Sequence, residues 1–291
     1  MPATASELEA TLIAWSDCIN KSKWDELPNH IYSKYVQNGQ EYTPESFTEH
    51  AKKAMGALGE DVLLNNDLIM VDERAQVAAY NMWFKFKHAT PFLGFEPTGR
   101  EIFLVEHRFI WFTDSKLSKS LFVINFDDMR NQITKPDAAN APVLIGTAPV
   151  PAGNTLSREK LEETYRAYID SINKHRTEAN LGEYVHESEV VVNNEALTLA
   201  GYRRAFESYA VFIQDLRIHI HTLIVDEKSQ RVAARLEITG TPTKEILGLV
   251  PDGHPVRLYE HATYQFLDGK IKKVWATQDL EEARQQQKSS K

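Results

Sequence analysis

Apolar side chains recur along the chain with two spacings, which predict helices in some stretches and strands in others. Residues 5–19 and 158–172 place apolar groups three and four positions apart, as in a helix with one buried face. Shorter helical patterns follow at 23–31 and 177–185, and the sequences TPESF and TLAGY each open a third helix. Alternating or continuous apolar runs predict strands at 34–38, 62–71, 77–87, 101–112 and 117–126, and again at 189–193, 216–225, 231–239, 256–266 and 271–279. Because helices precede an antiparallel sheet in both series, we predict the α+β class rather than alternating βαβ units.

The elements occur twice in the same order because the sequence itself is repeated. FLGFEPTGREIFLVEH at 92–107 matches ILGLVPDGHPVRLYEH at 246–261. The pairs AWSDCINK and AYIDSINK, and FDDMRNQ and LEEARQQ, match at nearly the same spacing. The two copies begin at residues 92 and 246, which is a period of 154 residues. A period of this length corresponds to whole domains, since solenoid repeats run about 20–50 residues. We therefore predict two domains, 1–133 and 156–291, joined by a Pro-, Ala- and Gly-rich linker at 134–155.

The composition is that of an ordinary globular protein and argues against several partners. Hydrophobic residues make up 42% and charged residues 25% of the 291 positions, and the net charge of −8 gives no basic surface for nucleic acid. No apolar run reaches the roughly 20 residues that span a bilayer, and the start of the chain lacks the basic segment of a secretory signal. We therefore expect a cytoplasmic protein without a membrane partner. The single cysteine, Cys18, lies in a helical pattern, where a structural role is expected.

Two sequence motifs connect the chain to a known family. LGFEPTGREI and LGLVPDGHPV, together with FLDGKIKKVWATQD at 266–279, resemble the SnoaL-like polyketide cyclase branch of the NTF2-like superfamily. The resemblance covers nearly the whole chain apart from the linker. It implies in each half a cone, a curved antiparallel sheet wrapped around helices, with one small-molecule pocket. Because such domains commonly dimerise through the outer sheet face, it also implies an internal pseudo-dimer that buries His107 and His261 between the sheets. Further oligomerisation is left open.

In the second half, a predicted hairpin brings two acidic residues together. The pair Asp268-Gly269 is a strong two-residue turn signal. The resulting register places Glu260, Tyr264, Trp275 and Asp279 on one face of the sheet. Glu260 and Asp279 would then be diagonal neighbours, roughly 7–8 Å apart, and one of their pKa values would rise enough for general acid or base catalysis. Tyr264 and Trp275 would line the pocket. The alternative is that Asp279 only caps the helix that follows it.

The first half offers a related but altered set. The same register places Glu106 at the position of Glu260, with Arg108 and Asn125 on its face, and Asn125 stands where Asp279 stands. Asparagine cannot take a proton at neutral pH, so this half lacks the acidic end position. Arg108 either joins a site with Glu106 or forms a structural ion pair with it. Trp83 is a further candidate for the pocket wall.

The resemblance also points to a histidine six residues before the Leu-Gly pair. His88 occupies that position in the first half, whereas Pro242 occupies it in the second. A pocket histidine suits proton transfer near neutral pH, and the alternative is a structural histidine at a strand end. Asn193 and Asn194 lie where relatives often carry a His-Asp pair, so acid–base capability is diminished there, and we expect Asn193 to contact substrate. Because the histidine and the aspartate fall in different halves, neither domain keeps the complete pair.

These features predict a cofactor-independent enzyme of secondary metabolism. The expected reaction is a cyclisation, isomerisation, dehydration or pericyclic step on an apolar polyketide- or terpenoid-like substrate, with Asp279, Glu260, His88 and Glu106 as catalytic candidates. We expect no cofactor. We also expect no metal, since His219 and His221 share a strand face without a clear third ligand. The alternative is a non-catalytic binding or scaffold protein. An epoxide hydrolase is a third possibility, although the Asp-Arg-Asp arrangement of those enzymes is not visible.

Overall fold

The chain folds into two compact units. A computed structural model describes residues 2–59, 61–92, 94–135, 144–150, 152–174 and 177–289. The first domain is Met1–Ala148 and the second is Pro149–Lys291. This division falls inside the segment predicted as a linker, of which residues 136–143 and 151 lie outside the described residues. No helix within the described ranges is long and apolar enough to cross a membrane.

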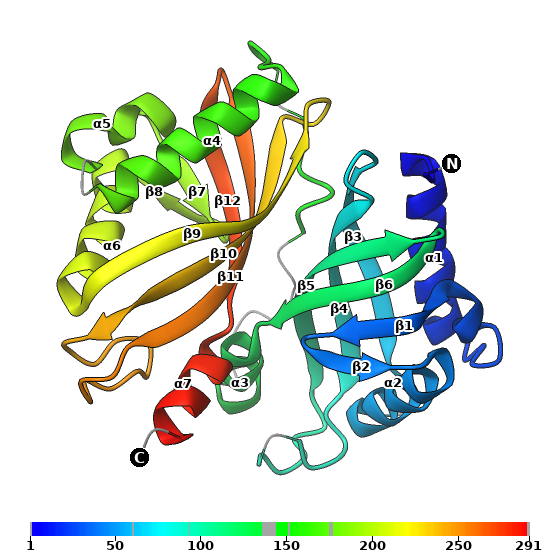
Figure 1. Cartoon of the computed structure of the whole chain (residues 1–291). Coiled ribbons are helices and arrows are strands. Elements are labelled where there is room, and N and C mark those ends of the chain that lie inside the picture. The colour runs from blue at the N-terminus through cyan, green and yellow to red at the C-terminus, as the bar shows by residue number, and fades with distance from the viewer. Residues whose placement is uncertain are drawn as a thin grey trace. The chain divides into compact units, whose positions relative to one another are not determined.

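The first domain is a six-stranded sheet with α1 and α2 against one face (Figure 1). Its strands follow the order β2-β1-β6-β5-β4-β3, and only the β1–β6 pair is parallel. The elements are α1 (Ala5–Asn20), a 3₁₀ helix (Leu27–His30), β1 (Ile31–Gln37), β2 (Gln40–Tyr42), α2 (Pro44–Leu58), β3 (Leu63–Asp72), β4 (Val77–Lys87), β5 (Glu101–Thr113), β6 (Lys116–Ile124) and α3 (Phe126–Thr134).

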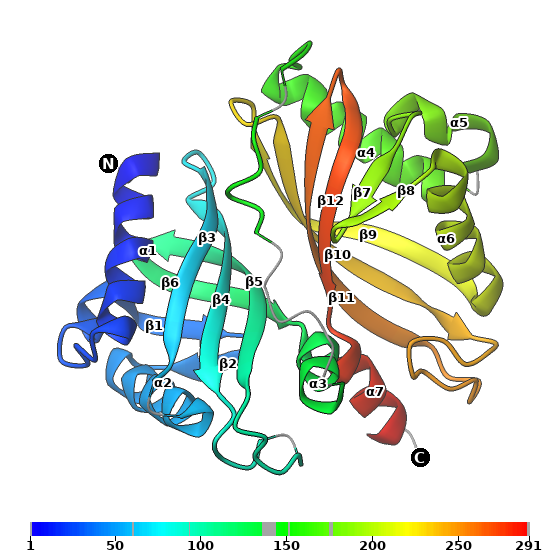
Figure 2. The same cartoon turned by 180° about the vertical axis from the view of Figure 1, so that it is seen from behind.

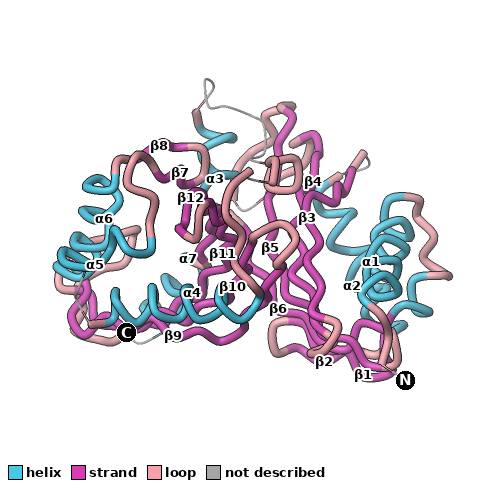
Figure 3. The backbone as a smooth tube through the Cα atoms, turned by 90° about the horizontal axis from the view of Figure 1, so that it is seen from above, coloured by secondary structure: helices cyan, strands magenta, loops and turns pink. Residues whose placement is uncertain are grey.

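The second domain repeats this topology with the order β8-β7-β12-β11-β10-β9, and here β7–β12 is the parallel pair. Its elements are α4 (Arg158–Asn173), α5 (Thr177–Tyr184), β7 (Val190–Val192), β8 (Glu195–Leu197), α6 (Leu199–Phe212), β9 (Ile213–Asp226), β10 (Arg231–Pro242), β11 (Val256–Leu267), β12 (Lys270–Gln278) and α7 (Leu280–Ser289). Helices α4, α5 and α6 cover one face of this curved sheet, which Figure 2 shows from behind and Figure 3 from above. The predicted α+β class and the two curved-sheet domains are confirmed.

The first helix of each domain begins where its sequence provides a hydroxyl cap. The Thr4 side chain accepts a hydrogen bond from the backbone N–H of Glu7, while the Glu7 carboxylate accepts one from the backbone N–H of Thr4. Ser157 likewise accepts from the backbone N–H of Lys160. Such caps satisfy backbone donors that have no partner inside the helix. Both helices end one residue beyond the predicted ranges.

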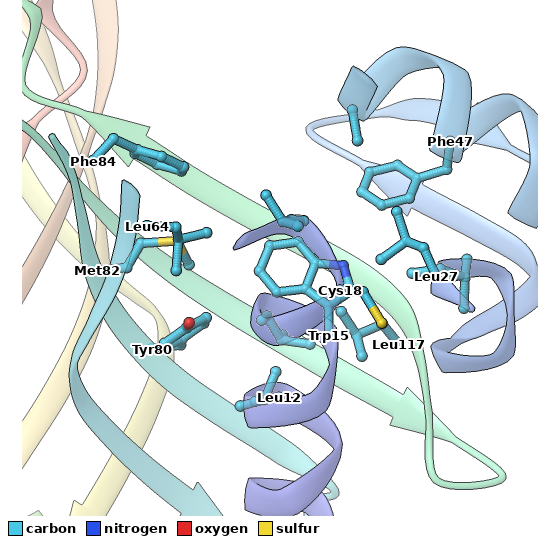
Figure 4. Packing of buried hydrophobic residues seen from close by; sticks show 14 of the residues in the cluster. Leu12, Trp15, Cys18, Leu27, Phe47, Leu64, Tyr80, Met82, Phe84 and Leu117 are labelled. Atoms are coloured by element: carbon cyan, nitrogen blue, oxygen red, sulfur yellow. The ribbon is translucent and has the colours of Figure 1, made fainter. Parts of the chain in front are cut away.

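The two cores differ in character although they occupy equivalent places. In the first domain, Trp15 of α1 packs edge-on against Tyr80 of β4 with ring centroids 6.4 Å apart, within a cluster of aliphatic and aromatic side chains such as Leu12, Phe47 and Phe84 (Figure 4). In the second domain, tyrosines replace many of these residues. Tyr165 and Tyr168 of α4 are fully buried and lie against Tyr264 of β11. The helix-covered face of each sheet is therefore the inner face of its domain.

The predicted hairpin register in the second domain is wrong by one residue. Phe266 pairs with Ile271 as expected, but Gln265 pairs with Lys273, so a β-bulge leaves Lys272 without an opposite residue. A bulge moves every later residue of one strand to the other face. Consequently Gln278, rather than Thr277, lies opposite Glu260. The predicted face-sharing of Glu260 with Trp275 and Asp279 is lost.

Candidate active site in the second domain

Glu260 lies on the inner face of β11 with a single polar partner on the neighbouring strand. Gln278 of β12 donates from Nε2 to Glu260 Oε2 over 2.7 Å. Among the described residues, no lysine, arginine or histidine forms an ion pair with Glu260. Burial raises the pKa of Glu260, and only the hydrogen bond from Gln278 opposes the rise. The protonated acid and the carboxylate are therefore closer in free energy near neutral pH than for an ordinary glutamate.

Tyrosines from two helices and one strand lie near enough to this carboxyl for its charge to affect them. The hydroxyl groups of Tyr168 and Tyr202 are hydrogen-bonded over 2.7 Å, and the rings of Tyr165 and Tyr264 lie 4.8 Å apart between centroids. Burial raises the pKa of all four hydroxyls, and the charge of Glu260 raises them further. They therefore remain protonated near neutral pH. The predicted placement of Tyr264 near Glu260 agrees with this geometry.

Part of the site remains accessible to solvent. Glu260, Gln278, Ala276 and Tyr209 of α6 all keep an intermediate exposed fraction, although Glu260 lies on the helix-covered face. Tyr209 lies close enough to Gln278 and Glu260 for both to affect the pKa of its hydroxyl, which burial raises. Glu260 thus combines a strongly desolvated carboxyl with an intermediate exposed fraction of the residue as a whole.

Asp279 has the structural role that was the alternative prediction. Its Oδ1 accepts a hydrogen bond of 3.1 Å from the backbone N–H of Glu282, in the first turn of α7. Its own backbone N–H donates to the Tyr259 carbonyl. Burial raises the pKa of Asp279, but Asp279 is not among the groups that shift the pKa of Glu260. The predicted pair of acids is therefore not formed.

The two tryptophans predicted to line a pocket, Trp275 and Trp83, each lie on the outer face of their sheet, away from the covering helices. Trp275 is opposite Thr263 and lies 6.0 Å from the Arg231 guanidinium, measured to the ring centroid. Trp83 packs against Phe103 with centroids 5.5 Å apart, on the face that Phe84 does not share. For Trp275 the cause is the bulge. For Trp83 it is the plain alternation of β4, in which Phe84 and Phe86 face inward.

In the first domain, Glu106 is closed off by an ion pair. Arg108 donates from Nε to Glu106 Oε1 over 2.6 Å, and the Arg108 and Glu106 side chains are only 6% and 4% exposed. The guanidinium also lies over the rings of Phe122 and Trp15, at 4.8 and 5.4 Å from their centroids. Burial raises the pKa of Glu106 and Arg108 lowers it in opposition. The structural ion pair, one of the two alternatives for Arg108, is the one observed.

His88 is buried far from Glu106. Its Nδ1 accepts a hydrogen bond from the backbone N–H of Thr98, so the proton of the neutral ring is on Nε2, which has no partner among the described residues. Met82 is the residue opposite Glu106, and His88 follows it by six positions, about 20 Å along an extended strand. The predicted combination of His88 with Glu106 is therefore not assembled.

The two predicted asparagines stabilise backbone. Asn125 accepts a hydrogen bond from the backbone N–H of Asp128 and caps α3, as Asp279 caps α7. Asn193 is exposed, and its amide bonds both the N–H and the carbonyl of Ala276. Asn38 makes the same pair of bonds to Phe122 in the first domain. The bonds of Asn193 and Asn38 continue the parallel strand pairing, and the bond of Asn125 caps a helix. The positions of Asn125 and Asn193 are therefore explained without a ligand.

Sequence reasoning missed the tyrosines of the two helices and Gln278. Tyr165 and Tyr168 are three residues apart on the buried face of α4, so helical spacing alone could have placed them inward. Tyr202 and Tyr209 lie seven residues apart on α6, again the spacing of one helix face. No signal could have found Gln278, because its face depends on the bulge at Lys272.

At three matched positions the inner sheet faces differ sharply in side-chain size. The first domain carries large side chains that lie side by side on β4, β5 and β6, and the second carries alanine at each equivalent position. The sets are Tyr80, Arg108 and Phe122, and Ala234, Ala262 and Ala276. Each set lies next to the glutamate at the equivalent position of its domain, Glu106 in the first and Glu260 in the second. At these three positions, the side chains that the sheet places beside the glutamate are smaller in the second domain than in the first.

Comparisons with known proteins match the second domain to one family. The model of the family "SnoaL-like polyketide cyclase" matches residues 162–287. A SnoaL-like polyketide cyclase from Agrobacterium tumefaciens is 34% identical, over 44% of this chain and 96% of that one, with a TM-score of 0.40. TsrD from Streptomyces laurentii is 22% identical over 43% and 92%, with a TM-score of 0.39. PrhC from Penicillium brasilianum is 19% identical over 45% and 87%, with a TM-score of 0.36. No curated protein matches the chain.

Proposed function

The chain belongs to the SnoaL-like polyketide cyclase family, and we propose that its second domain is a cofactor-independent enzyme acting on an apolar small molecule. The reaction is a cyclisation or isomerisation in which Glu260 exchanges a proton with the substrate. The observation that carries this proposal is a desolvated carboxyl that has no cationic partner among the described residues, in a residue of intermediate exposure near several tyrosines.

Glu260 is suited to act first as a base and then as an acid. A general acid or base works best when its pKa lies near the operating pH, and burial moves the pKa of Glu260 in that direction. Gln278 holds Oε2, and no described residue donates to Oε1, so Oε1 is the oxygen that meets the substrate. The carboxylate would take a proton from substrate carbon or oxygen and return it after the new bond forms.

Tyr209 is the hydroxyl best placed to assist. It remains partly accessible and lies near both Glu260 and Gln278, whereas Tyr165, Tyr168, Tyr202 and Tyr264 are buried in the core. A neutral phenol donates a hydrogen bond to a substrate oxygen as negative charge develops on it. The surrounding aromatic and aliphatic side chains favour an apolar substrate.

The test is turnover of a panel of apolar polyketide- and terpenoid-like compounds by the full chain, followed by chromatography. We expect Glu260→Gln to lower kcat by about 10²- to 10⁴-fold, because the amide cannot exchange a proton. Glu237→Gln is the matched control, since Glu237 lies on the opposite face of the same sheet and accepts from the Tyr259 hydroxyl. Wild-type turnover by Glu260→Gln would refute the proposal.

The first domain supports a different role. Its glutamate is already paired with Arg108 and is almost completely buried, so it has no accessible acid or base at this position. We therefore propose that the first domain acts as a non-catalytic scaffold for the second, which retains the alternative function for one half of the chain.

A further inference from the structure

The first domain shows which kind of group satisfies the inner glutamate in this fold. The planar Arg108 cation binds Glu106 Oε1 through two nitrogens, at 2.6 Å from Nε and 2.5 Å from Nη2. Aromatic rings of Phe122 and Trp15 face the same guanidinium. A carboxylate on one side and π-systems on the others are the surroundings that proteins use to bind cations.

The second domain keeps the carboxylate and an aromatic residue but not the cation. Ala262 pairs with Ala276 at the register position where Arg108 pairs with Phe122. Tyr168 takes the place of Trp15 in the repeat AWSDCINK and AYIDSINK. No other described basic side chain pairs with Glu260 in place of Arg108. The site beside Glu260 therefore lacks the cation that the equivalent position supplies to Glu106.

A second observation also indicates an unfilled polar requirement. The Tyr165 hydroxyl is buried and has no well-aligned hydrogen-bond partner among the described residues, although the Tyr264 hydroxyl and Glu260 both lie near enough to affect its pKa. A buried polar atom without a partner is costly and is usually satisfied by a ligand or water. A ligand N–H group beside Glu260 would have this phenol oxygen as a further acceptor.

From this comparison we infer that the ligand of the second domain carries a cationic nitrogen, an ammonium or guanidinium on an apolar skeleton, which pairs with Glu260 as Arg108 pairs with Glu106. This inference rests on the proposed function only in placing the ligand beside Glu260, and it specifies the substrate class. The apolar skeleton follows from Val190, Val192 and Val274, which stand where the first domain has Tyr35, Gln37 and Ser120. A bound cation favours the ionised form of Glu260, which is the form that can accept a proton.

Ligand-observed NMR with two probes of nearly equal shape tests the inference on the full chain. The probes are 2-phenylethylammonium and neutral 2-phenylethanol at pH 7.5. We expect the ammonium to bind at least about tenfold more tightly, since a charge-assisted bond to a desolvated carboxylate is stronger than a neutral one. Glu260→Gln should abolish this preference, while Glu237→Gln should keep it.

A second variant covers the case in which Glu260→Gln does not fold. Ala262→Arg restores in the second domain the cation of the first, and it should abolish binding of 2-phenylethylammonium. Equal or tighter binding of the alcohol to the wild type, or an ammonium preference that survives in Glu260→Gln or Ala262→Arg, would overturn the inference. Turnover that depends on Glu260 without any ammonium preference would overturn the inference and leave the proposed function standing. An ammonium preference that depends on Glu260, without any turnover that depends on Glu260, would refute the proposed catalysis and leave the inference standing.

Discussion

Two glutamates at matched positions of one chain have opposite surroundings. Glu106 is paired with Arg108 and sealed, whereas Glu260 has Gln278 as its partner and remains accessible. The change from Arg108 to Ala262 removes the countercharge, and the change from Phe122 to Ala276 removes bulk beside it. The chemical capacity of a glutamate is therefore set by its neighbours on the next strands, not by its place in the repeat.

The raised pKa of Glu260 predicts a pH-dependent stability cost. A carboxyl whose pKa is higher in the folded chain binds its proton more tightly there, so its contribution is favourable below its unfolded pKa and is lost as the pH rises through the folded pKa. We expect Glu260→Gln to have a higher free energy of unfolding than the wild type at pH 8. The difference should shrink towards pH 4, as measured by urea denaturation at both pH values. A variant less stable than the wild type at pH 8 would contradict this.

The ion pair of the first domain predicts that removing one of its charges destabilises the protein, whereas removing the charge of Glu260 stabilises it. Arg108→Ala leaves a buried uncompensated carboxylate, so we expect a loss of about 3–5 kcal/mol in the free energy of unfolding. The double variant Glu106→Leu with Arg108→Met removes both charges at similar volume and should recover most of that loss. Denaturation curves of the two variants and the wild type, at one pH, measure both effects. Equal stability of the two variants would argue against the pair as the cause.

At the scale of elements, a single bulge decides which side chains reach the site. The hairpin of β11 and β12 has an Asp268-Gly269 turn, but Lys272 has no residue opposite it on β11. This bulge reverses which face of the sheet each later residue of β12 points to. The repeated Leu-Gly motif also has a backbone explanation. Gly248 and Gly253 both adopt positive φ, at +74° and +81°, and Gly94 and Gly99 do so in the first domain. Side chains rarely tolerate that conformation, so the glycines recur for geometry rather than chemistry.

The cap of α7 gives a prediction at this scale. Asp279→Ala removes the side-chain acceptor for the Glu282 N–H, and we expect it to cost about 1 kcal/mol of stability. Asp279→Asn should cost much less, because Asn125 already performs this role for α3. Thermal unfolding of the two variants at pH 7 separates capping from charge. A large loss in Asp279→Asn would show that the carboxylate itself is needed.

For the molecule as a whole, the matched interiors predict one ligand site per chain. The first domain fills the place beside its glutamate with Arg108 and Phe122, and the second offers alanines there. Crystals soaked with 2-phenylethylammonium should show density beside Glu260 and none beside Glu106. Density in both domains would show that the ion pair opens to ligand. The predicted pseudo-dimer stays a prediction.

The sequence by itself determined the duplicated architecture, the order of elements, the helix caps and Glu260 as a candidate. These features depend on local periodicity, on capping residues such as Thr4 and Ser157, and on a repeat visible in the letters. Only the tertiary structure decided that Asp279 caps a helix, that Trp275 faces away and that Gln278 contacts Glu260. One unpaired residue, Lys272, reverses a two-residue period without a distinct sequence signal. The pairing of Arg108 with Glu106 likewise required coordinates, because alternation places both on one face without fixing their contact.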